Sequence, residues 1–347
     1  MTPDTTLYLD KNENQYGPAP RCLDVLHLMT TNELSSYSRD FVRGVKSRLS
    51  ERLAFDLQVP ESQILLGEGS EDLLKQAIHC YLGRGEKILC SAQSWWYYQA
   101  LASEVEGETV TYSLKRKKDS FHFDVDEMMA LCRKVSPRIV LIASPNNPTG
   151  NSFSHGDLHK ITDAFRDCIV ILDQAYWGFG ETVEARMSAM VDACPRLIIL
   201  RTFSKYYALA GARIGFGVVG KNLGRLSKFA ARYLGYSRIS EALALAALDS
   251  EEYYSSVRNA MLSDRERYYA YIDNLPGYNV FRSDANFVLV NVPFGKIGLL
   301  REFLGDRKIQ LKFFSEPEFQ NCVRITIGTR EQNQTVLQAF SEFTSEQ

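Results

Sequence analysis

Short apolar runs alternate with amphipathic segments through the middle of the chain, and this alternation constrains the fold more than any other feature. It is typical of a mostly parallel sheet covered by helices, because parallel strands are joined by helical crossovers. Asp124 and Ser154 each precede a segment with helical spacing and are expected to be N-caps. We therefore predict helices over 71–82, 124–134 and 154–165, and seven strands over 63–66, 87–91, 108–113, 139–143, 169–173, 197–201 and 214–218.

The pattern becomes helical after Gly220. Residues 241–274 contain neither Pro nor Gly and are predicted to form one long helix, straight or bent. Beyond Pro276, strand-like pieces surround two helical segments, which is typical of a smaller α+β domain. These strand-like pieces are 285–292, 310–314 and 322–327.

The length of 347 residues is sufficient for two domains. We expect an α/β large domain over 31–264, with a mostly parallel seven-stranded sheet covered by helices. Residues 265–347 are expected to form the smaller α+β domain together with 1–30. This N-terminal arm is too short to fold alone, so it should pack against the smaller domain or a partner subunit.

Composition excludes several classes of protein. The content of 45% hydrophobic and 24% charged residues argues against disorder, and the net charge of −2 leaves no electrostatic footprint for nucleic acid or an anionic membrane. The seven cysteines are scattered without CxxC spacing, which favours a reducing cytoplasm and predicts neither disulfides nor a metal site. No signal peptide or membrane span is expected from the apolar runs.

The segment Thr202-Phe203-Ser204-Lys205 carries the strongest chemical signal, with Arg213 eight residues after the lysine. A lysine amine can form a Schiff base with an aldehyde, and a guanidinium can bind a phosphate through two hydrogen bonds. An ordinary surface lysine is the alternative. The position of Lys205 in a hydroxyl-rich turn after a predicted strand argues for the site.

Two further segments suit the same chemistry. Asp173, in Leu-Asp-Gln-Ala-Tyr, ends a predicted buried strand, and α/β folds bind ligands at that edge of the sheet. A carboxylate there can keep a ring nitrogen protonated, although an acid in this position can also cap a helix. Tyr176 and Asn147, the latter in Ser-Pro-Asn-Asn-Pro-Thr-Gly, can both hydrogen-bond a phenolic oxygen.

A phosphate cup is predicted at Leu-Gly-Glu-Gly-Ser-Glu, residues 66–71, where a strand leads into a helix. The N–H groups of Gly69, Ser70 and Glu71 and the helix dipole can bind a dianion there, with hydroxyls from Ser70, Thr202 and Ser204. A plain strand–turn–helix connection would look similar.

An aromatic face for a ring is predicted in Gln-Ser-Trp-Trp-Tyr-Tyr. Only one of Trp95 and Trp96 can stack; we assign Trp95, and Trp96 is the alternative. Arg324, which begins Arg-Ile-Thr-Ile-Gly-Thr-Arg-Glu, is assigned to an anionic substrate group. Arg330 in the same segment is assigned with it, or else is a surface residue at a helix start.

The pattern GxGxxG at 215–220 resembles a dinucleotide fingerprint. Its residues Phe216, Val218 and Val219 belong to a predicted strand, whereas the fingerprint requires the turn that follows one. We interpret the match as chance.

Taken together, the three segments around Asn147, Asp173 and Lys205 resemble pyridoxal 5′-phosphate (PLP) enzymes of the aspartate aminotransferase fold, called fold type I. The resemblance is nearest to histidinol-phosphate aminotransferases and runs from Leu9 to about Ala339. It includes Asn-Glu-Asn-Gln-Tyr-Gly-Pro at 12–18, Ser-Asp-Ala-Asn-Phe at 283–287 and Val-Arg-Ile-Thr-Ile-Gly-Thr-Arg-Glu at 323–331.

This resemblance implies a PLP-dependent aminotransferase that works by a ping-pong mechanism through a Lys205 Schiff base, with Asp173 and Tyr176 as the other catalytic residues. The substrates would be histidinol phosphate and 2-oxoglutarate/glutamate. Tyr16 would line the substrate site, together with Asn147. Tyr37 would reach the cofactor phosphate of a neighbouring subunit, which implies a homodimer with shared active sites.

Three departures from the family pattern leave the substrate open. The chain has Gln174 where the family has Glu, Tyr-Ser-Arg-Asp at 37–40 where it has Tyr-Pro-Asp, and Gln-Ser-Trp at 93–95 where Pro-Thr-Tyr is common. Aminotransferases of aromatic or other amino acids, threonine-phosphate decarboxylases and PLP-dependent oxidases are the alternatives. A regulatory protein with this fold would lack the lysine or carry a basic appendage, and a nicotinamide dehydrogenase would need a true GxGxxG turn.

Overall fold

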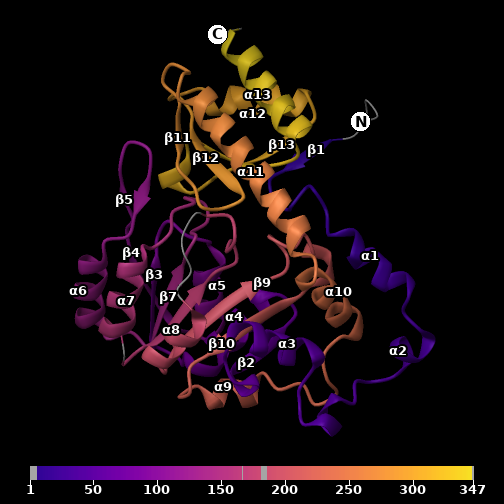
Figure 1. The fold of residues 1–347 in the computed structure, drawn as a ribbon. Helices are drawn as coiled ribbons and strands as arrows, with labels where there is room; N and C mark the ends of the chain where they lie inside the picture. The colour runs from indigo at the N-terminus through magenta and orange to yellow at the C-terminus, as the bar shows by residue number, and fades with distance from the viewer. Residues whose placement is uncertain (1–5, 166, 181–185, 346–347) are drawn as a thin grey trace.

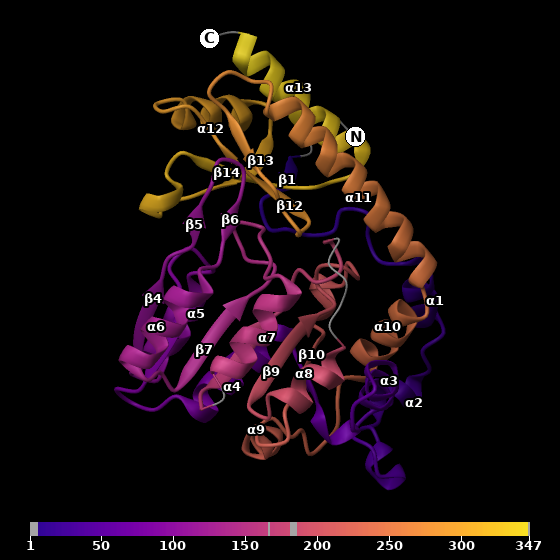
Figure 2. The ribbon, with the colours of Figure 1, turned by 60° about the vertical axis from the view of Figure 1, so that its left-hand side comes forward.

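Two β-sheets, one above the other in Figures 1 and 2, organise the computed structural model, which describes residues 6–165, 167–180 and 186–345. The larger sheet has the order β2-β10-β9-β8-β7-β3-β4. Its strands are β2 (Ile64–Gly67), β3 (Lys87–Ser91), β4 (Glu108–Tyr112), β7 (Ile139–Ala143), β8 (Ile169–Asp173), β9 (Leu197–Thr202) and β10 (Gly215–Val219).

All seven strands coincide with the predicted runs to within one or two residues. Among the strands of the larger sheet, β10 alone runs against both of its neighbours, so the sheet is mostly parallel, as predicted. Strand β10 also contains most of the GxGxxG match, which confirms that this pattern is strand and not a nucleotide-binding turn.

Helices bury both faces of the larger sheet. Successive residues of β8 alternate between two apolar clusters, with Ile171 on one face and Leu172 on the other. The Leu172 face packs against α3 (Arg48–Leu57), α6 (Val125–Val135), α7 (His155–Ala164), α8 (Met187–Ala193) and α10 (Arg238–Leu248). The Ile171 face packs against α4 (Ser70–Tyr81), α5 (Tyr97–Glu104) and α9 (Gly224–Phe229).

The two predicted N-caps are confirmed. The Asp124 side chain accepts a hydrogen bond from the Glu127 N–H at 2.9 Å, and the Ser154 side chain accepts one from the Asp157 N–H at 3.1 Å. Each bond satisfies a backbone donor that the first turn of a helix would otherwise leave unpaired. These caps explain why α6 and α7 start where the sequence places them.

The smaller sheet has the order β1-β13-β14-β12-β11. Its strands are β1 (Leu7–Leu9), β11 (Asn279–Phe281), β12 (Phe287–Asn291), β13 (Ile309–Phe313) and β14 (Cys322–Thr326). Helices α11 (Glu251–Ile272), α12 (Ile297–Asp306) and α13 (Arg330–Ser345) share one apolar cluster with this sheet. Strand β1 pairs in parallel with β13, so the N-terminal arm packs against the smaller sheet.

Helix α11 and one hairpin extend between the upper and lower parts of the molecule. The long helix α11 descends from the smaller sheet toward α10, and the hairpin of β5 (Lys115–Arg116) and β6 (Phe121–His122) rises toward the smaller sheet (Figure 2). The Phe121 and Phe281 rings lie 4.7 Å apart between their centroids. The domain limit at 264/265 falls inside α11 and stays a prediction. Helices α1 (Pro20–His27) and α2 (Thr31–Ser35) run along the outer edge beside α10.

One prediction about helices is wrong. Residues 241–274 do not form a single helix, because α10 ends at Leu248 and α11 begins at Glu251. Asp249 binds Arg52, with 2.6 Å between Oδ1 and Nη1, and the Ser250 hydroxyl donates to the Ala246 carbonyl at 2.8 Å. Short polar side chains of this kind compete with helical hydrogen bonding, so an Asp-Ser pair can end a helix without Pro or Gly.

No helix among the described residues has the length and apolar character that a membrane span would need. All seven cysteines lie within the described ranges and are free thiols.

Candidate active site

A cavity of about 640 Å³ lies between the two sheets, at the carboxyl ends of β7, β8 and β9. The N-terminal arm and strands β13 and β14 supply the opposite wall. Most of the predicted site residues line it: Ser70, Glu71, Trp95, Asn147, Asp173, Tyr176, Thr202, Ser204, Lys205, Arg213 and Arg324. Segments far apart in the sequence therefore converge as the edge rule for parallel sheets anticipates.

Lys205 follows β9 and presents its amine to the cavity. Its Nζ donates to the Lys11 carbonyl at 2.9 Å and lies 5.8 Å from the centroid of the Tyr176 ring. Burial of the amine, and then the nearby charge of Arg324, lower the pKa of Lys205 from its usual value to about 8. An amine with such a pKa is partly neutral near pH 7 and can act as a nucleophile or a base.

Asp173 is buried at the last position of β8. Its Oδ2 accepts from the Tyr98 hydroxyl at 2.8 Å, and its Oδ1 accepts from the Ala175 N–H at 2.9 Å. Burial raises the pKa of Asp173, while these two hydrogen bonds oppose the rise. The described residues offer it no cationic partner, so this carboxylate is suited to pair with a cation that enters the cavity.

Tyr176 and Asn147 meet the N-terminal arm and β14 on one side of the cavity. The Tyr176 hydroxyl accepts a hydrogen bond from Asn12 Nδ2 at 2.9 Å. Arg324 donates through Nη1 to Asn147 Oδ1 and through Nη2 to the Asp10 carbonyl. Among the described residues the buried Nε of Arg324 has no hydrogen-bond partner.

The predicted phosphate cup is assembled from three segments. Thr202 Oγ1 donates to Ser204 Oγ at 2.9 Å, and Arg213 Nη1 lies 3.5 Å from Ser204 Oγ. A Cβ on Gly69, whose φ is +87°, would lie 2.6 Å from Arg213 Nη2, so only glycine lets the guanidinium approach the start of α4. Glu71 Oε2 is 3.7 Å from the same nitrogen. These contacts are long, so the guanidinium keeps donors for a stronger acceptor.

Trp95 and Trp96 both line the cavity but differ in their surroundings. Trp96 is 60% exposed, whereas Trp95 is half-buried, with its ring 5.7 Å from the ring of Tyr98. Because Tyr98 bonds Asp173, Trp95 is fixed relative to the buried carboxylate. The stacking role of Trp95 stays a prediction.

Four predicted residues do not line the cavity of the single chain, and one of them is Gly69, just before α4. Tyr16 packs against the apolar cluster of the smaller sheet, and Arg330 binds the buried Asp264, with 2.8 Å between Nε and Oδ1. The side chain of Tyr37 is 69% exposed. Their roles stay predictions, and for Tyr37 the prediction places the contact in a neighbouring subunit.

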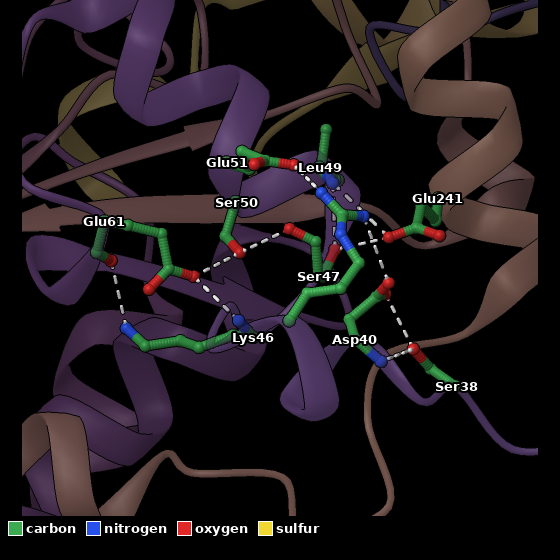
Figure 3. Close-up of polar contacts among 10 residues, drawn as sticks. Ser38, Asp40, Lys46, Ser47, Leu49, Ser50, Glu51, Glu61 and Glu241 are labelled. Atoms are coloured by element: carbon green, nitrogen blue, oxygen red, sulfur yellow. Dashed lines mark hydrogen bonds and ion pairs between the residues drawn. The ribbon is translucent and has the colours of Figure 1, made fainter.

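The chain just after Tyr37 is anchored by a polar network, drawn in Figure 3. Ser38 Oγ donates to Asp40 Oδ2 at 2.7 Å. Ser47 Oγ donates to Glu241 Oε1 at 2.5 Å and Ser50 Oγ to Glu61 Oε1 at 2.6 Å, which ties this segment to α10 and to the residues before β2. Residues 38–40, which differ from the family pattern, therefore belong to a segment that hydrogen bonds hold in place.

Among the cavity-lining residues that sequence reasoning did not assign are Asn12, Tyr98 and Lys312. Asn12 lies in the N-terminal motif that carried the resemblance, and Tyr98 in the aromatic cluster, but nothing in the sequence pairs them with Tyr176 and Asp173. Lys312 was expected only as part of a strand. In the sheet it pairs with Arg324 across β13 and β14, so two cations share one wall.

Comparison with known proteins decides the family. The model of the family "Aminotransferase class I and II" matches residues 8–340. The chain belongs to this family. A histidinol-phosphate aminotransferase of Arabidopsis thaliana (enzyme 1, chloroplastic) is 31% identical over 342 residues, which cover 98% of this chain and 79% of that protein.

Solved structures of related enzymes have the same fold as this chain. The structure of histidinol-phosphate aminotransferase from Sinorhizobium meliloti in complex with pyridoxal-5′-phosphate has a TM-score of 0.86 at 23% identity, covering 99% of this chain and 92% of that one. L-threonine-O-3-phosphate decarboxylase from Porphyromonas gingivalis has a TM-score of 0.81 at 20% identity, covering 98% and 99%. At these identities the likeness establishes the fold alone, and it confirms fold type I.

The cofactor of this aminotransferase is pyridoxal 5′-phosphate, and the donor set of the cavity fits it. An aldehyde needs an amine, which Lys205 provides, and a pyridine nitrogen needs a carboxylate, which Asp173 provides. The space that glycine leaves at position 69 lets Arg213 approach the start of α4, so a phosphate could meet both together. These roles of individual residues are proposals, developed below.

Proposed function

We propose that this aminotransferase transfers the amino group of L-histidinol phosphate to 2-oxoglutarate, which becomes glutamate. The observation that carries the proposal is the pair of cations Lys312 and Arg324, which face one cavity from neighbouring strands. The 31% identity to a histidinol-phosphate aminotransferase over nearly the whole chain supports the same substrate.

A ping-pong mechanism requires that both substrates enter one cavity in turn. Histidinol phosphate brings a phosphate and 2-oxoglutarate brings a carboxylate, so the same cations can hold either anion. Arg324 is buried and fixed by Asn147 and Asp10, while Lys312 is exposed. The fixed guanidinium of Arg324 and the more mobile ammonium of Lys312 can together bind two anions of different shape.

PLP, when bound, supplies an aldehyde that condenses with amines and a ring that accepts electrons from a breaking Cα–H bond. The chain supplies the rest. Lys205 Nζ would hold the cofactor and then accept the proton from Cα, and the Asp173 carboxylate would keep a proton on the ring nitrogen. Tyr176 and Asn147 would hydrogen-bond the phenolic oxygen of the cofactor, and Trp95 would cover its ring.

The absorbance spectrum of the purified protein with PLP tests this proposal. A yellow band should form, and L-histidinol phosphate added without a keto acid should bleach it, because the first half-reaction leaves the amino group on the cofactor. A band that persists with histidinol phosphate but is bleached by phosphothreonine or an aromatic amino acid would reassign the substrate. Failure to form the band at all would remove PLP chemistry.

The role of Arg324 predicts a binding defect. Replacing Arg324 by alanine should raise KM for histidinol phosphate and for 2-oxoglutarate by roughly 10- to 100-fold, since a charge-assisted hydrogen bond contributes about 1.5–3 kcal/mol. Steady-state kinetics with both substrates measures this. Arg330→Ala is the matched control, because Arg330 binds Asp264 away from the cavity. An equal or larger KM effect in the control would move the anion site to Arg330.

The pKa of Lys205, about 8, predicts a pH dependence for PLP attachment. Only the neutral amine attacks an aldehyde, so the attachment rate should rise with pH and level off above about 8. At pH 7 roughly one lysine in ten would be neutral, against fewer than one in a thousand for an ordinary lysine. Stopped-flow absorbance of cofactor-free protein mixed with PLP measures the profile. A midpoint near 10 would contradict the perturbed pKa.

We further infer a homodimer with shared active sites, through the face that carries Tyr37. Large apolar side chains are exposed along this part of the chain, with Phe41 72% and Val42 74% exposed. Tyr233, 97% exposed, lies on the same face, because a Cβ on neighbouring Gly235 would be 2.9 Å from Ser38. Apolar patches of this extent usually mark protein interfaces. Sedimentation equilibrium tests this assembly.

We also propose that the protein works in a reducing compartment such as the cytoplasm, because all seven of its cysteines are free thiols.

A further inference from the structure

The N-terminal arm places one buried amide directly on a proposed catalytic group. Asn12 is 1% exposed, and its Nδ2 donates to the Tyr176 hydroxyl at 2.9 Å. The two residues are 164 positions apart in the chain. Within the described ranges this is the one hydrogen bond that the Tyr176 hydroxyl makes to the protein, so Asn12 is its protein donor there.

The orientation of the Asn12 amide follows from its other contacts. The Asn12 N–H donates to Thr326 Oγ1 at 3.0 Å, so the Thr326 hydroxyl has its own proton left for Asn12 Oδ1, 3.2 Å away. Asn286 Nδ2 donates to the backbone carbonyl of Asn12 at 3.1 Å, which holds the main chain at this position. With Oδ1 accepting from Thr326, the NH₂ group is the end that faces Tyr176.

The direction of this hydrogen bond determines where the tyrosine proton goes. A phenol oxygen that accepts from Asn12 must point its own O–H elsewhere, and Tyr176 lines the cavity. We propose that Asn12 is a positioning residue for Tyr176. The Asn12 amide donates to the hydroxyl oxygen of Tyr176 and so directs the tyrosine proton toward the ligand in the cavity. The inference rests on the proposed function, in which that ligand is the phenolic oxygen of PLP.

The same contact changes the acidity of the tyrosine. Burial raises the pKa of Tyr176, while the charge of Arg324 and the Asn12 hydrogen bond lower it. A hydrogen bond donated to the Tyr176 oxygen stabilises its phenolate and makes the hydroxyl more acidic. Tyr176 is therefore a stronger hydrogen-bond donor with Asn12 than without it. Loss of the amide should therefore weaken the bond that Tyr176 makes to the cofactor.

The experiment compares Asn12→Ala and Asn12→Asp with Asn14→Ala. Asn14 is a matched control: it is a buried asparagine of the same arm, and its Nδ2 donates to the Tyr206 carbonyl at 3.1 Å instead of to Tyr176. The readout is the pH midpoint of the visible band of PLP bound to the protein, with no substrate present. A donor to the phenolic oxygen of the cofactor lowers this midpoint, because it favours the anionic oxygen.

We expect N12A to raise the midpoint by roughly half to one pH unit, as one hydrogen bond allows. N12D should raise it further, because its carboxylate accepts the tyrosine proton and withdraws it from the cavity, while Thr326 can still donate to it. N14A should match the wild type. Thermal unfolding shows whether N12A and N14A fold alike.

Equal midpoints in N12A and N14A would overturn this inference and leave the proposed function intact. If N12A does not fold, N12D carries the test, and a wild-type midpoint in N12D overturns the inference equally. A wild-type protein that forms no visible band with PLP would overturn both the proposed function and the inference.

Discussion

Replacing Lys205 by alanine is expected to lower turnover by a factor on the order of 10⁴ or more, the scale seen when a nucleophile or base is removed. Lys205 follows β9 and its pKa is lowered to about 8, so its amine can both attack an aldehyde and carry a proton. The variant should fold and bind PLP, because the phosphate cup and Asp173 remain. Its bound PLP should resist fixation by borohydride, which mass spectrometry detects.

Lys312→Ala is the control for this variant, since Lys312 lines the same cavity from β13. It should keep the borohydride-fixed PLP on Lys205 and lose affinity for anionic substrates instead. Lys205→Arg separates charge from chemistry, because a guanidinium keeps the positive charge but does not deprotonate in proteins. Turnover near the wild-type value in K205A, or fixation of PLP on another lysine, would sink the assignment.

Local sequence patterns predicted the main residues of this site, and the structure added contacts between residues far apart in the sequence. Asp173 and Lys205 could be found because Asp173 ends one buried strand and Lys205 follows another, and parallel strands have their carboxyl ends at one edge of the sheet. Tyr98 could not be paired with Asp173, since that bond joins α5 to β8 across the fold. The three-residue strands β1 and β11 were missed because three residues are too few to show alternation.

The break between α10 and α11 has the same origin. Asp249 accepts a hydrogen bond from Arg52 on α3, and composition and spacing do not predict that contact. In each case the missed feature depends on a partner that the fold supplies, which a single sequence does not identify.

Replacing Asp173 by asparagine should produce the second-largest loss. The side chain is buried and receives two donors, the Tyr98 hydroxyl on Oδ2 and the Ala175 N–H on Oδ1. An asparagine of the same shape has one acceptor oxygen, so one of these donors must face an NH₂ group. The loss of negative charge removes the partner of a protonated ring nitrogen, and kcat should fall by about 10²- to 10³-fold.

Tyr98→Phe distinguishes charge from positioning at Asp173. It removes one donor but leaves the carboxylate, so kcat should fall only by roughly tenfold, the equivalent of about one hydrogen bond. D173N should bind PLP more weakly and with a shifted visible spectrum, whereas Y98F should keep the wild-type spectrum. The order of the two variants is the decisive result, because charge on the ring nitrogen is an electrostatic requirement and the Tyr98 bond only orients its source. If D173N were as active as Y98F, the carboxylate would have a structural role alone.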